Sequence, residues 1–315
     1  MAILTVTNIN DSGVGSLRQA IAEAQSGDRI RFASKLANKK ITLNSGQLTI
    51  DKNLIIDGSD APGITISGNK SDRVFYISKG IAATLKDLAI VDGKSNDGGG
   101  IKVEQEGSEL TLINARIDNN VGKITGGLFV GWKSTANVIN SSFNNNDGTA
   151  AEPTSKNAGF SAGAISTWGS ATLSIEGTTF DNNKGYNGGA IYSIFSTLSI
   201  EDSDFINNVS TSRAGGGAIF NDGIGRIKGE PTADEKIYIH GSRFEGNKAE
   251  KAGGALAFWG YGKDSVIIED SSIINNEVVR NSDDKYGRGA GIAASNIGLT
   301  LRNTTVANNS AEGQG

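Results

Sequence analysis

Short alternations of apolar and polar residues recur along most of the chain, and each clear copy ends in asparagine. One clear copy, LSIEDSDFINN at 198–208, opens with Leu and Ile alternating with polar residues. Strict alternation over about four to eight residues is typical of a β-strand with one buried face. The repeat is present at 110–120, 136–146, 173–183, 198–208, 237–247, 266–276 and 299–309, with a degenerate copy at 83–93. We therefore expect one structural unit that is repeated along the chain.

A glycine-rich block follows each asparagine end except the last and precedes the next alternating stretch, as GGAI at 188–191 does. Such blocks are found at 98–101, 126–129, 162–165, 188–191, 216–219, 253–256 and 289–292. The distance between successive asparagine ends varies, while the two motifs themselves stay constant. The chain is therefore expected to form the same coil many times, with insertions only at its corners.

The position after each alternating stretch is predicted to be a bend. It is always Asn, Asp or Gly, and these residue types tolerate a left-handed backbone conformation. This column comprises Asp87, Asn114, Asn140, Gly177, Asp202, Gly241, Asp270 and Asn303. An apolar residue three positions later is predicted to stack inside the coil: Ile117, Phe143, Phe180, Phe205, Phe244, Ile273 and Val306. The terminal asparagines are expected to form a second bend, with side-chain amides hydrogen-bonded from coil to coil.

Short strands joined by tight bends, with like residues above like, are typical of a parallel β-helix. One coil cannot bury its own inner face, so neighbouring coils supply both the hydrogen bonds and the core. Roughly ten coils at ~4.8 Å each predict a rod about 50 Å long, and parallel crossovers favour the right-handed form. We expect an all-β, right-handed parallel β-helix that forms a single domain over 1–315, with an N-terminal cap at 1–32 and coils at 33–315.

The expected cap contains a short helix. Leu17 and Ile21 have helical spacing within 16–25, and Ser16 with Gln19 has the form of a capping box. A β-helix end without a cover exposes strand edges that recruit other chains. We expect this helix to lie over the first coil.

The sequence SAEGQG follows Asn309 and stops where another glycine block is due. No capping segment is recognisable there, so we expect further coils or domains of the same polypeptide beyond Gly315. The N-terminal MAILTVTN lacks the charged and apolar regions of a secretory signal peptide. Export would then use a removed leader or another signal.

Composition and charge exclude several classes of protein. The chain has 315 residues, a net charge of −4 and no cysteine, which excludes disulfides, thiolate metal sites and cysteine nucleophiles. A net negative chain argues against the basic surface that non-specific nucleic-acid binding needs. No apolar run approaches the ~18 residues of a membrane-spanning helix. We expect no nucleic-acid partner and no transmembrane segment.

The paired motifs resemble the repeat of the polymorphic outer membrane protein family, GGA[ILV] with FxxN. FNNN, FDNN, FINN and FEGN match the second motif, and GGAI, AGAI and GGAL match the first. The N-terminal TVTNINDSGVGSLRQAI is similar to the CSLREA-type cap of large bacterial surface proteins, with Gly15 in place of its cysteine. These resemblances imply a pectin-lyase-like solenoid exported to the cell surface or the medium, for adhesion or scaffolding. They carry no catalytic residues over to this chain.

An outward column just before the first bend is the candidate catalytic face, because many parallel β-helices are polysaccharide lyases, epimerases or hydrolases. The column comprises Lys86, Ile113, Ile139, Glu176, Glu201, His240, Glu269 and Arg302. Glu176 and Glu201 would lie about 5 Å apart on adjacent coils, a separation compatible with paired-carboxylate glycoside chemistry. Tyr238 shares this face with His240. Between Glu201 and Glu269, such a pair would move a proton next to a uronic acid carboxylate. The alternative is a solvated face of alternating charges.

Three tryptophans are the candidate ligand-binding residues. Trp132, Trp168 and Trp259 each follow an apolar residue of a glycine block by three positions. The residues counted from are Phe129, Ile165 and Leu256. Trp132 and Trp168 are expected outside the rod on neighbouring coils, with Phe195 next along. An exposed aromatic strip would bind sugar rings or a protein partner; the alternative is that insertions cover these indoles.

Three insertions interrupt the repeat, at 147–161, 221–236 and 277–288. The first and the third fall at the same corner and are predicted to form one wall of the rod. Loops on a rigid scaffold are where binding specificity tends to lie, so a groove would run between this wall and the tryptophans.

Metal signals are confined to Asp92, Asp97 and Asp118, which would meet near one corner and bind Ca²⁺ with backbone carbonyls. The chain has no EF-hand loop, and backbone geometry alone explains Asp at bends. No other cofactor is expected.

These patterns favour a rigid extracellular scaffold or adhesin-like module of a bacterial surface or secreted protein, with a glycan or a surface protein as partner. The alternative is a secreted polysaccharide lyase, epimerase or hydrolase that acts on an acidic polysaccharide through the Tyr238 and His240 face. We lean towards the scaffold, without enzyme activity.

Overall fold

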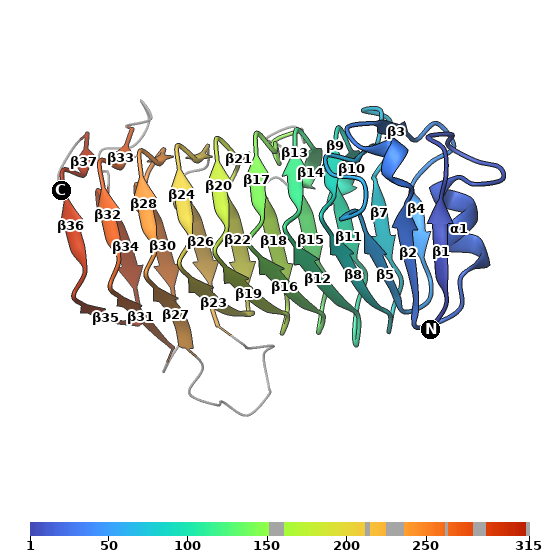
Figure 1. Cartoon of the computed structure of the whole chain (residues 1–315). Helices are drawn as coiled ribbons and strands as arrows, with labels where there is room; N and C mark the ends of the chain where they lie inside the picture. The colour runs from blue at the N-terminus through green and yellow to red at the C-terminus, as the bar shows by residue number, and fades with distance from the viewer. Residues whose placement is uncertain (151–160, 212–214, 225–235, 262–263, 280–287, 313–315) are drawn as a thin grey trace.

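The chain forms a long rod of stacked coils, as the repeat predicts. A computed structural model describes residues 1–150, 161–211, 215–224, 236–261, 264–279 and 288–312. Within these residues the strands run from coil to coil along the rod in sequence order (Figure 1), and successive coils pair in parallel. The predicted right-handed parallel β-helix is confirmed.

Three long sheets form the walls of the rod in the described residues. The eleven-stranded sheet contains β1 (Ile3–Val6), β2 (Asp28–Phe32), β5 (Leu54–Asp57), β8 (Ala82–Lys86), β12 (Glu109–Ile113), β16 (Thr135–Ile139), β19 (Thr172–Glu176), β23 (Thr197–Glu201), β27 (Lys236–His240), β31 (Ser265–Glu269) and β35 (Gly298–Arg302). The ten-stranded sheet contains β3 (Lys40–Thr42), β6 (Thr65–Ser67), β9 (Ala89–Val91), β13 (Arg116–Asp118), β17 (Ser142–Asn144), β20 (Thr179–Asp181), β24 (Asp204–Ile206), β28 (Arg243–Glu245), β32 (Ser272–Ile274) and β36 (Thr305–Ala307). The nine-stranded sheet contains β4 (Leu48–Ile50), β7 (Phe75–Ile77), β11 (Ile101–Val103), β15 (Leu128–Val130), β18 (Ile165–Trp168), β22 (Ile191–Ile194), β26 (Ile219–Asp222), β30 (Leu256–Trp259) and β34 (Ile292–Ser295).

Two short sheets lie along the chain between the ten-stranded and the nine-stranded walls. One pairs β10 (Lys94–Asp97) with β14 (Val121–Thr125). The other contains β21 (Lys184–Gly185), β25 (Val209–Ser210), β29 (Lys248–Ala249), β33 (Glu277–Val278) and β37 (Ser310–Ala311). Both mark the corner where the glycine blocks begin.

The interior is a continuous apolar core in which identical residues stack. Phe180 lies between Phe143 and Phe205, with ring centroids 5.1 and 4.6 Å apart and nearly parallel planes. Phe205 stacks on Phe244 at 4.7 Å, and none of these four side chains is exposed. The predicted aromatic ladder is therefore confirmed.

The first predicted bend is also confirmed, because all eight residues of that column have a positive φ, between 44° and 58°. The second bend lies one residue earlier than expected. Asn182 and Asn207, with φ of 54°, take the left-handed conformation, whereas Asn183 and Asn208 point inward and are fully buried. The first asparagine of each pair therefore forms the bend, and the second, terminal asparagine forms hydrogen bonds inside the rod.

These buried asparagines form the expected ladder from coil to coil. Asn183 Nδ2 donates to Asn208 Oδ1 at 2.9 Å and to the carbonyl oxygen of Phe143 at 2.8 Å. The same Asn208 oxygen accepts from the backbone N–H of Asn183 at 3.0 Å. A second ladder, of small hydroxyl residues such as Ser203 and Ser242, follows the first bend. Its role was not foreseen from the sequence.

The N-terminal helix is confirmed as α1 (Leu17–Glu23), and a 3₁₀ turn, η1 (Ser34–Leu36), follows β2. Ser16 caps α1 by accepting a hydrogen bond from the backbone N–H of Gln19. Because β1 and β2 already belong to the eleven-stranded sheet, the segment expected as a cap also contributes the first strands of the rod. The described residues include no helix with the length and apolarity that crossing a bilayer requires.

Candidate functional site

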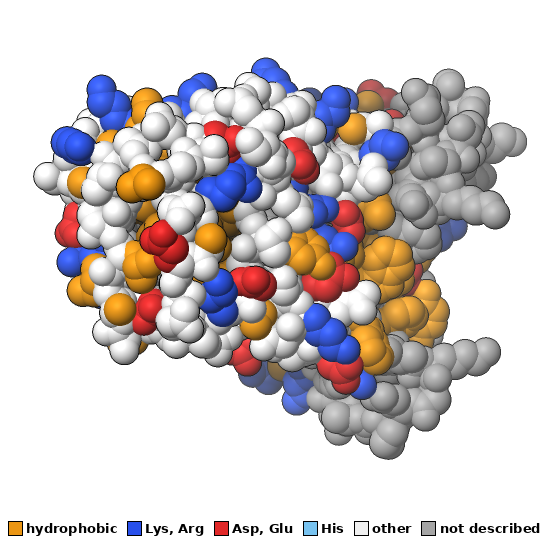
Figure 2. Space-filling view, turned by 90° about the vertical axis from the view of Figure 1, so that its right-hand side faces the viewer, with side chains coloured by type: hydrophobic (Ala, Val, Ile, Leu, Met, Phe, Trp, Pro, Cys, Tyr) orange, Lys and Arg blue, Asp and Glu red, His pale blue; other side chains and the backbone are white. Residues whose placement is uncertain are grey.

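The outer face of the nine-stranded sheet carries an apolar cluster separate from the core. Strand register aligns Phe129, Ser166, Tyr192, Phe220 and Ala257 in one outward column. Tyr192 and Phe220 are only 2% and 1% exposed, and their rings stack at 5.6 Å. In the end view, large hydrophobic side chains gather at one edge of the rod (Figure 2). This face therefore has apolar character that a solvated sheet surface would lack.

Two indoles remain accessible beside this column. Trp168 is 40% exposed and meets Phe129 edge-on at 6.2 Å, and Trp132 is 36% exposed. Lys133 Nζ lies 4.5 Å from the centre of the Trp132 ring, a cation–π contact. A Cβ on Gly169 would approach Trp132 Cδ1 to 2.6 Å, so the glycine lets this indole lie against the backbone of the next coil.

The sequence predicts Phe129 as the inward residue equivalent to Ile165, and this prediction is wrong by one residue. Leu128, not Phe129, is the inward residue that pairs with Ile165. The reason is that GGLF places its first apolar residue where the other blocks place theirs, so Phe129 takes the outward position. Trp132 and Trp168 still lie on neighbouring coils, but they belong to different columns.

Phe195 holds an unusual conformation in the same region. Its φ is 46°, which is rare for a bulky residue and is found where the surroundings enforce it. Its ring lies 5.7 Å from that of Tyr261, and a Cβ on Gly223 would approach both rings closely. Tyr261 donates to Asp222 Oδ1 at 2.6 Å, and this hydrogen bond, with burial, raises the pKa of Tyr261 to about 12.

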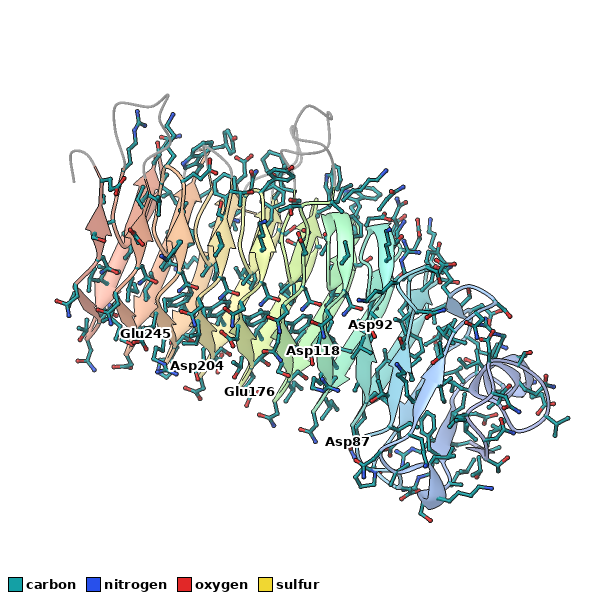
Figure 3. All side chains as sticks on the ribbon, turned by 90° about the horizontal axis from the view of Figure 1, so that it is seen from above. Asp87, Asp92, Asp118, Glu176, Asp204 and Glu245 are labelled. Atoms are coloured by element: carbon teal, nitrogen blue, oxygen red, sulfur yellow. The ribbon has the colours of Figure 1, made fainter. Side chains whose placement is uncertain are left out.

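Trp259 lies in the column of Trp168, three coils further along the rod, and lines a hollow of about 760 Å³. Its ring meets Phe220 edge-on at 5.0 Å. Ile292, Ala293 and other small side chains form apolar lining, while Lys251 and Arg288 add positive charge. The hollow thus combines an aromatic surface with cationic groups. Ring-bearing side chains project along this edge of the rod in the view from above (Figure 3).

Sequence reasoning identified the three tryptophans and Phe195 but missed Tyr192, Phe220 and Tyr261. A signal for two of them was present in the sequence. Tyr192 and Phe220 directly follow the inward residues Ile191 and Ile219 of their glycine blocks, so they are aromatic residues at an outward position. Most of each predicted insertion, at 151–160, 225–235 and 280–287, lies outside the described residues.

The candidate catalytic column is assembled as expected on the eleven-stranded sheet. Glu176 pairs with Glu201, Glu201 with His240, and His240 with Glu269. The rings of Tyr238 and His240 stack at 6.1 Å. Tyr238 Oη donates to Glu269 Oε2 at 3.1 Å. Partial desolvation and this hydrogen bond raise the pKa of Tyr238.

These side chains are also engaged with neighbouring charges. His240 Nε2 lies 3.2 Å from Asp270 Oδ2, and Glu269 forms an ion pair with Arg302 at 2.6 Å. Glu176 and Glu201 are exposed. The face can orient a proton donor and an acceptor, and it equally fits a network of surface ion pairs.

Two of the three candidate metal ligands form ion pairs with different cationic side chains. Asp97 forms ion pairs with Arg73 and Lys102, each at 3.0 Å. Asp118 pairs with Arg116, which lies two residues away on the same strand. Asp92 and Asp118 lie on neighbouring coils (Figure 3), but no group of three potential metal-ligating side chains occurs in the described residues.

Comparison with solved structures supports the fold. The chain is similar to the PL6 family alginate lyase AlyGC, at a TM-score of 0.56 and 13% identity, over 99% of this chain and 40% of that one. It is also similar to pectate lyase Pel9A, at a TM-score of 0.45 and 14% identity, over 100% of this chain and 79% of that one. The chain thus spans 40% of the length of the alginate lyase that it matches. At 13% identity, the likeness to the alginate lyase shows the parallel β-helix fold and nothing about activity. No protein-family model and no curated protein matches the chain.

Proposed function

We propose that this chain is a rigid β-helical scaffold that binds glycans on the outer face of its nine-stranded sheet. The observation that carries this proposal is the placement of Trp132 and Trp168, accessible on neighbouring coils, with the hollow beside Trp259 on the same sheet. Exposed indoles stack against the apolar faces of sugar rings. Because parallel coils repeat at ~4.8 Å, the strip is extended along the rod and suits a linear ligand.

The rigidity of the scaffold supports binding. Phe195 and Tyr261 hold each other in contact, and Tyr192 packs on Phe220 beside the accessible rings. Aromatic side chains fixed in this way lose little conformational freedom when a ligand binds. The strip therefore needs no rearrangement to receive a sugar chain.

We place this scaffold at the bacterial cell surface or in the medium. The support is the resemblance of the GGA and FxxN motifs to the polymorphic outer membrane protein repeat, and of the N-terminal segment to the CSLREA-type cap. In this proposal the rod is an adhesin-like module that presents its aromatic face to surface glycans.

A second candidate function is a polysaccharide lyase, epimerase or hydrolase for an acidic polysaccharide. It is favoured by the hydrogen bond from Tyr238 to Glu269 and by the stacking of Tyr238 on His240. In such an enzyme Tyr238 and His240 would abstract and return the proton beside a uronate carboxylate.

The two functions are distinguished by testing variants of both faces in a glycan-binding assay and in an assay of polysaccharide cleavage. The double substitution Trp132→Ala and Trp168→Ala should lower retention on a glycan array at least tenfold. The comparison is with nucleobases that stack on aromatic side chains, where each stacked ring contributes about 1–3 kcal/mol to binding. The variant Tyr238→Phe with His240→Ala should bind unchanged and serves as the matched control on the other wall. Unchanged binding by the tryptophan variant overturns the glycan-binding proposal. Release of unsaturated sugars from alginate or pectate by the parent protein, absent in the Tyr238 and His240 variant, would establish the enzyme instead.

A further inference from the structure

A group of lysines surrounds a hollow at the corner between the ten-stranded and nine-stranded sheets. The hollow has a volume of about 660 Å³, and Lys70, Lys94 and Lys123 line it. Asp72 is the only carboxylate among its lining residues. All three lysines are exposed, so their ammonium groups are available to a ligand in solution.

None of these three lysines forms an ion pair within the part of the chain that the structure describes. Other lysines of the rod do: Lys102 lies 3.0 Å from Asp97 and 3.2 Å from Glu104. Like charges that share one hollow repel each other, and the chain as a whole carries a net charge of −4. A local excess of positive charge on a net negative protein is therefore a specific feature of this corner.

The backbone fixes the lysines on successive coils. The N–H of Lys70 donates to the carbonyl oxygen of Asp92 at 2.7 Å, and the N–H of Lys94 donates to that of Asp72 at 2.9 Å. Lys123 belongs to β14, which pairs in parallel with β10, the strand that begins at Lys94. The three charges are thus carried by rigid, hydrogen-bonded backbone and not by a free loop.

A buried arginine supports the hollow from beneath. Arg73 is 8% exposed, and its Nη2 donates to Ser95 Oγ at 2.7 Å and to Asp97 Oδ1 at 3.0 Å. Ser95 lines the hollow, so this bond fixes its side chain. The Asp97 carboxylate is already shared between Arg73 and Lys102, so among the lining residues the three exposed lysines face the single carboxylate of Asp72.

We propose that this lysine hollow binds a linear acidic polysaccharide whose anionic groups follow the axis of the rod. Coils about 4.8 Å apart place the first and third lysine backbones about 10 Å apart. A sugar polymer with a charge on successive residues can contact all three lysines along the rod. The hollow lies at the corner before the strands of the nine-stranded sheet, whereas the tryptophans lie at or just after the ends of these strands, so this site does not depend on the aromatic strip.

The test compares two triple variants that lose the same charge. Lys70→Gln, Lys94→Gln and Lys123→Gln should together weaken binding to immobilised alginate at least tenfold at low salt, and should reduce the salt dependence of binding. Lys35→Gln, Lys39→Gln and Lys40→Gln remove three exposed lysines elsewhere and should change the affinity less than twofold. Thermal unfolding of both variants confirms that they fold.

Three outcomes would overturn the proposal. These are unchanged alginate binding by the first variant, equal weakening by the two variants, and full competition by inorganic phosphate at the same concentration of charge. Salt separates this site from the aromatic strip, because about 0.5 M salt screens exposed lysines and leaves stacking on indoles in place. The Trp132 and Trp168 variant should therefore keep the salt-sensitive part of alginate binding even if the proposed glycan strip fails its own test.

Discussion

The inside and the outside of the same strands follow different rules. Strand β24 pairs with β20 in register, so that Phe205 lies on Phe180 inside the rod while Ile206 lies beside Asp181 outside it. The interior pair is identical and closely stacked, whereas the exterior pair has no chemical likeness. Successive coils stack directly on each other, so an interior residue must pack against the equivalent residues of the coils before and after it. An exterior residue is free of that constraint and can serve a ligand.

This contrast separates stability from function. Substitutions in the interior columns are expected to cost folding free energy and to leave local binding chemistry intact. Substitutions at Trp168 or Lys94 on the exterior are expected to do the reverse. The following predictions test the contrast from its strongest case to its weakest.

The largest loss of stability is expected from Phe205→Ala. The ring is fully buried and stacked on both sides, at 4.6 and 4.7 Å. Its removal opens a cavity that the two flanking coils cannot easily close, with a cost of about 3–5 kcal/mol. Chemical denaturation followed by circular dichroism measures this cost through the transition midpoint.

The matched exterior variant for this experiment is Ile206→Ala, on the same strand with the opposite orientation. It should change stability by less than about 1 kcal/mol. Equal losses from Phe205→Ala and Ile206→Ala would mean that the interior stack has no special role, and the comparison of the two faces would fail.

The asparagine ladder is expected to give the next largest effect. In Asn208→Ala, the buried N–H and Nδ2 of Asn183 lose their shared acceptor, and the carbonyl oxygen of Phe180 loses its donor. Buried polar groups left without partners cost about 1–3 kcal/mol each, so the variant should lose about 2–4 kcal/mol after local relaxation. Hydrogen exchange should also show faster exchange at the Asn183 amide.

Asn144→Ala is the control for the ladder. Asn144 lies on the outer face, half-buried, and donates to Asp118 at 2.9 Å. Its loss should cost less than about 1 kcal/mol. If Asn144→Ala were as destabilising as Asn208→Ala, burial of the amide would not be the cause of the effect.

The same contrast explains how much of the molecule the sequence could predict. The interior columns were readable because Phe143, Phe180, Phe205 and Phe244 repeat in one motif, and repetition reports the coil directly. The left-handed residue at the second corner was misplaced by one, because two adjacent asparagines fill different roles and composition alone does not tell them apart. The register of β15 was also misplaced, since Leu128 and Phe129 are both apolar.

The candidate sites were only partly readable, for a related reason. Trp132 and Trp168 are rare residues and attract notice, whereas Tyr192 and Phe220 are outward aromatics whose burial depends on what packs over the sheet. The lysine hollow combines Lys70 from a turn with Lys94 and Lys123 from two short corner strands, and these segments share no motif. Only the stacking of three coils brings these residues together.

The smallest effect on stability is expected from substitution of Asp57, whose carboxylate is buried although it does not belong to the apolar core. Burial alone would raise the pKa of this carboxyl, but a hydrogen bond from Ser59 N–H at 3.0 Å and the positive charges of Lys86 and Arg29 outweigh it. The pKa of Asp57 is therefore lowered from its ordinary value of 3.8. The ionised form is favoured in the folded protein, so its stabilising contribution is present above about pH 4 and is lost as the pH falls through the lowered pKa.

Asp57→Asn should consequently lower the melting temperature at pH 7, and the difference from the parent protein should shrink as the pH falls below about 4. Asp51→Asn is the control, because Asp51 is 62% exposed beside Lys52 and an exposed ion pair contributes little. Melting curves at several pH values distinguish the two variants. A constant difference for Asp57→Asn at every pH would show that packing of the side chain, and not its charge, is what matters there. It would also mean that the charges of Lys86 and Arg29 contribute nothing measurable to stability through Asp57, although this carboxylate is buried.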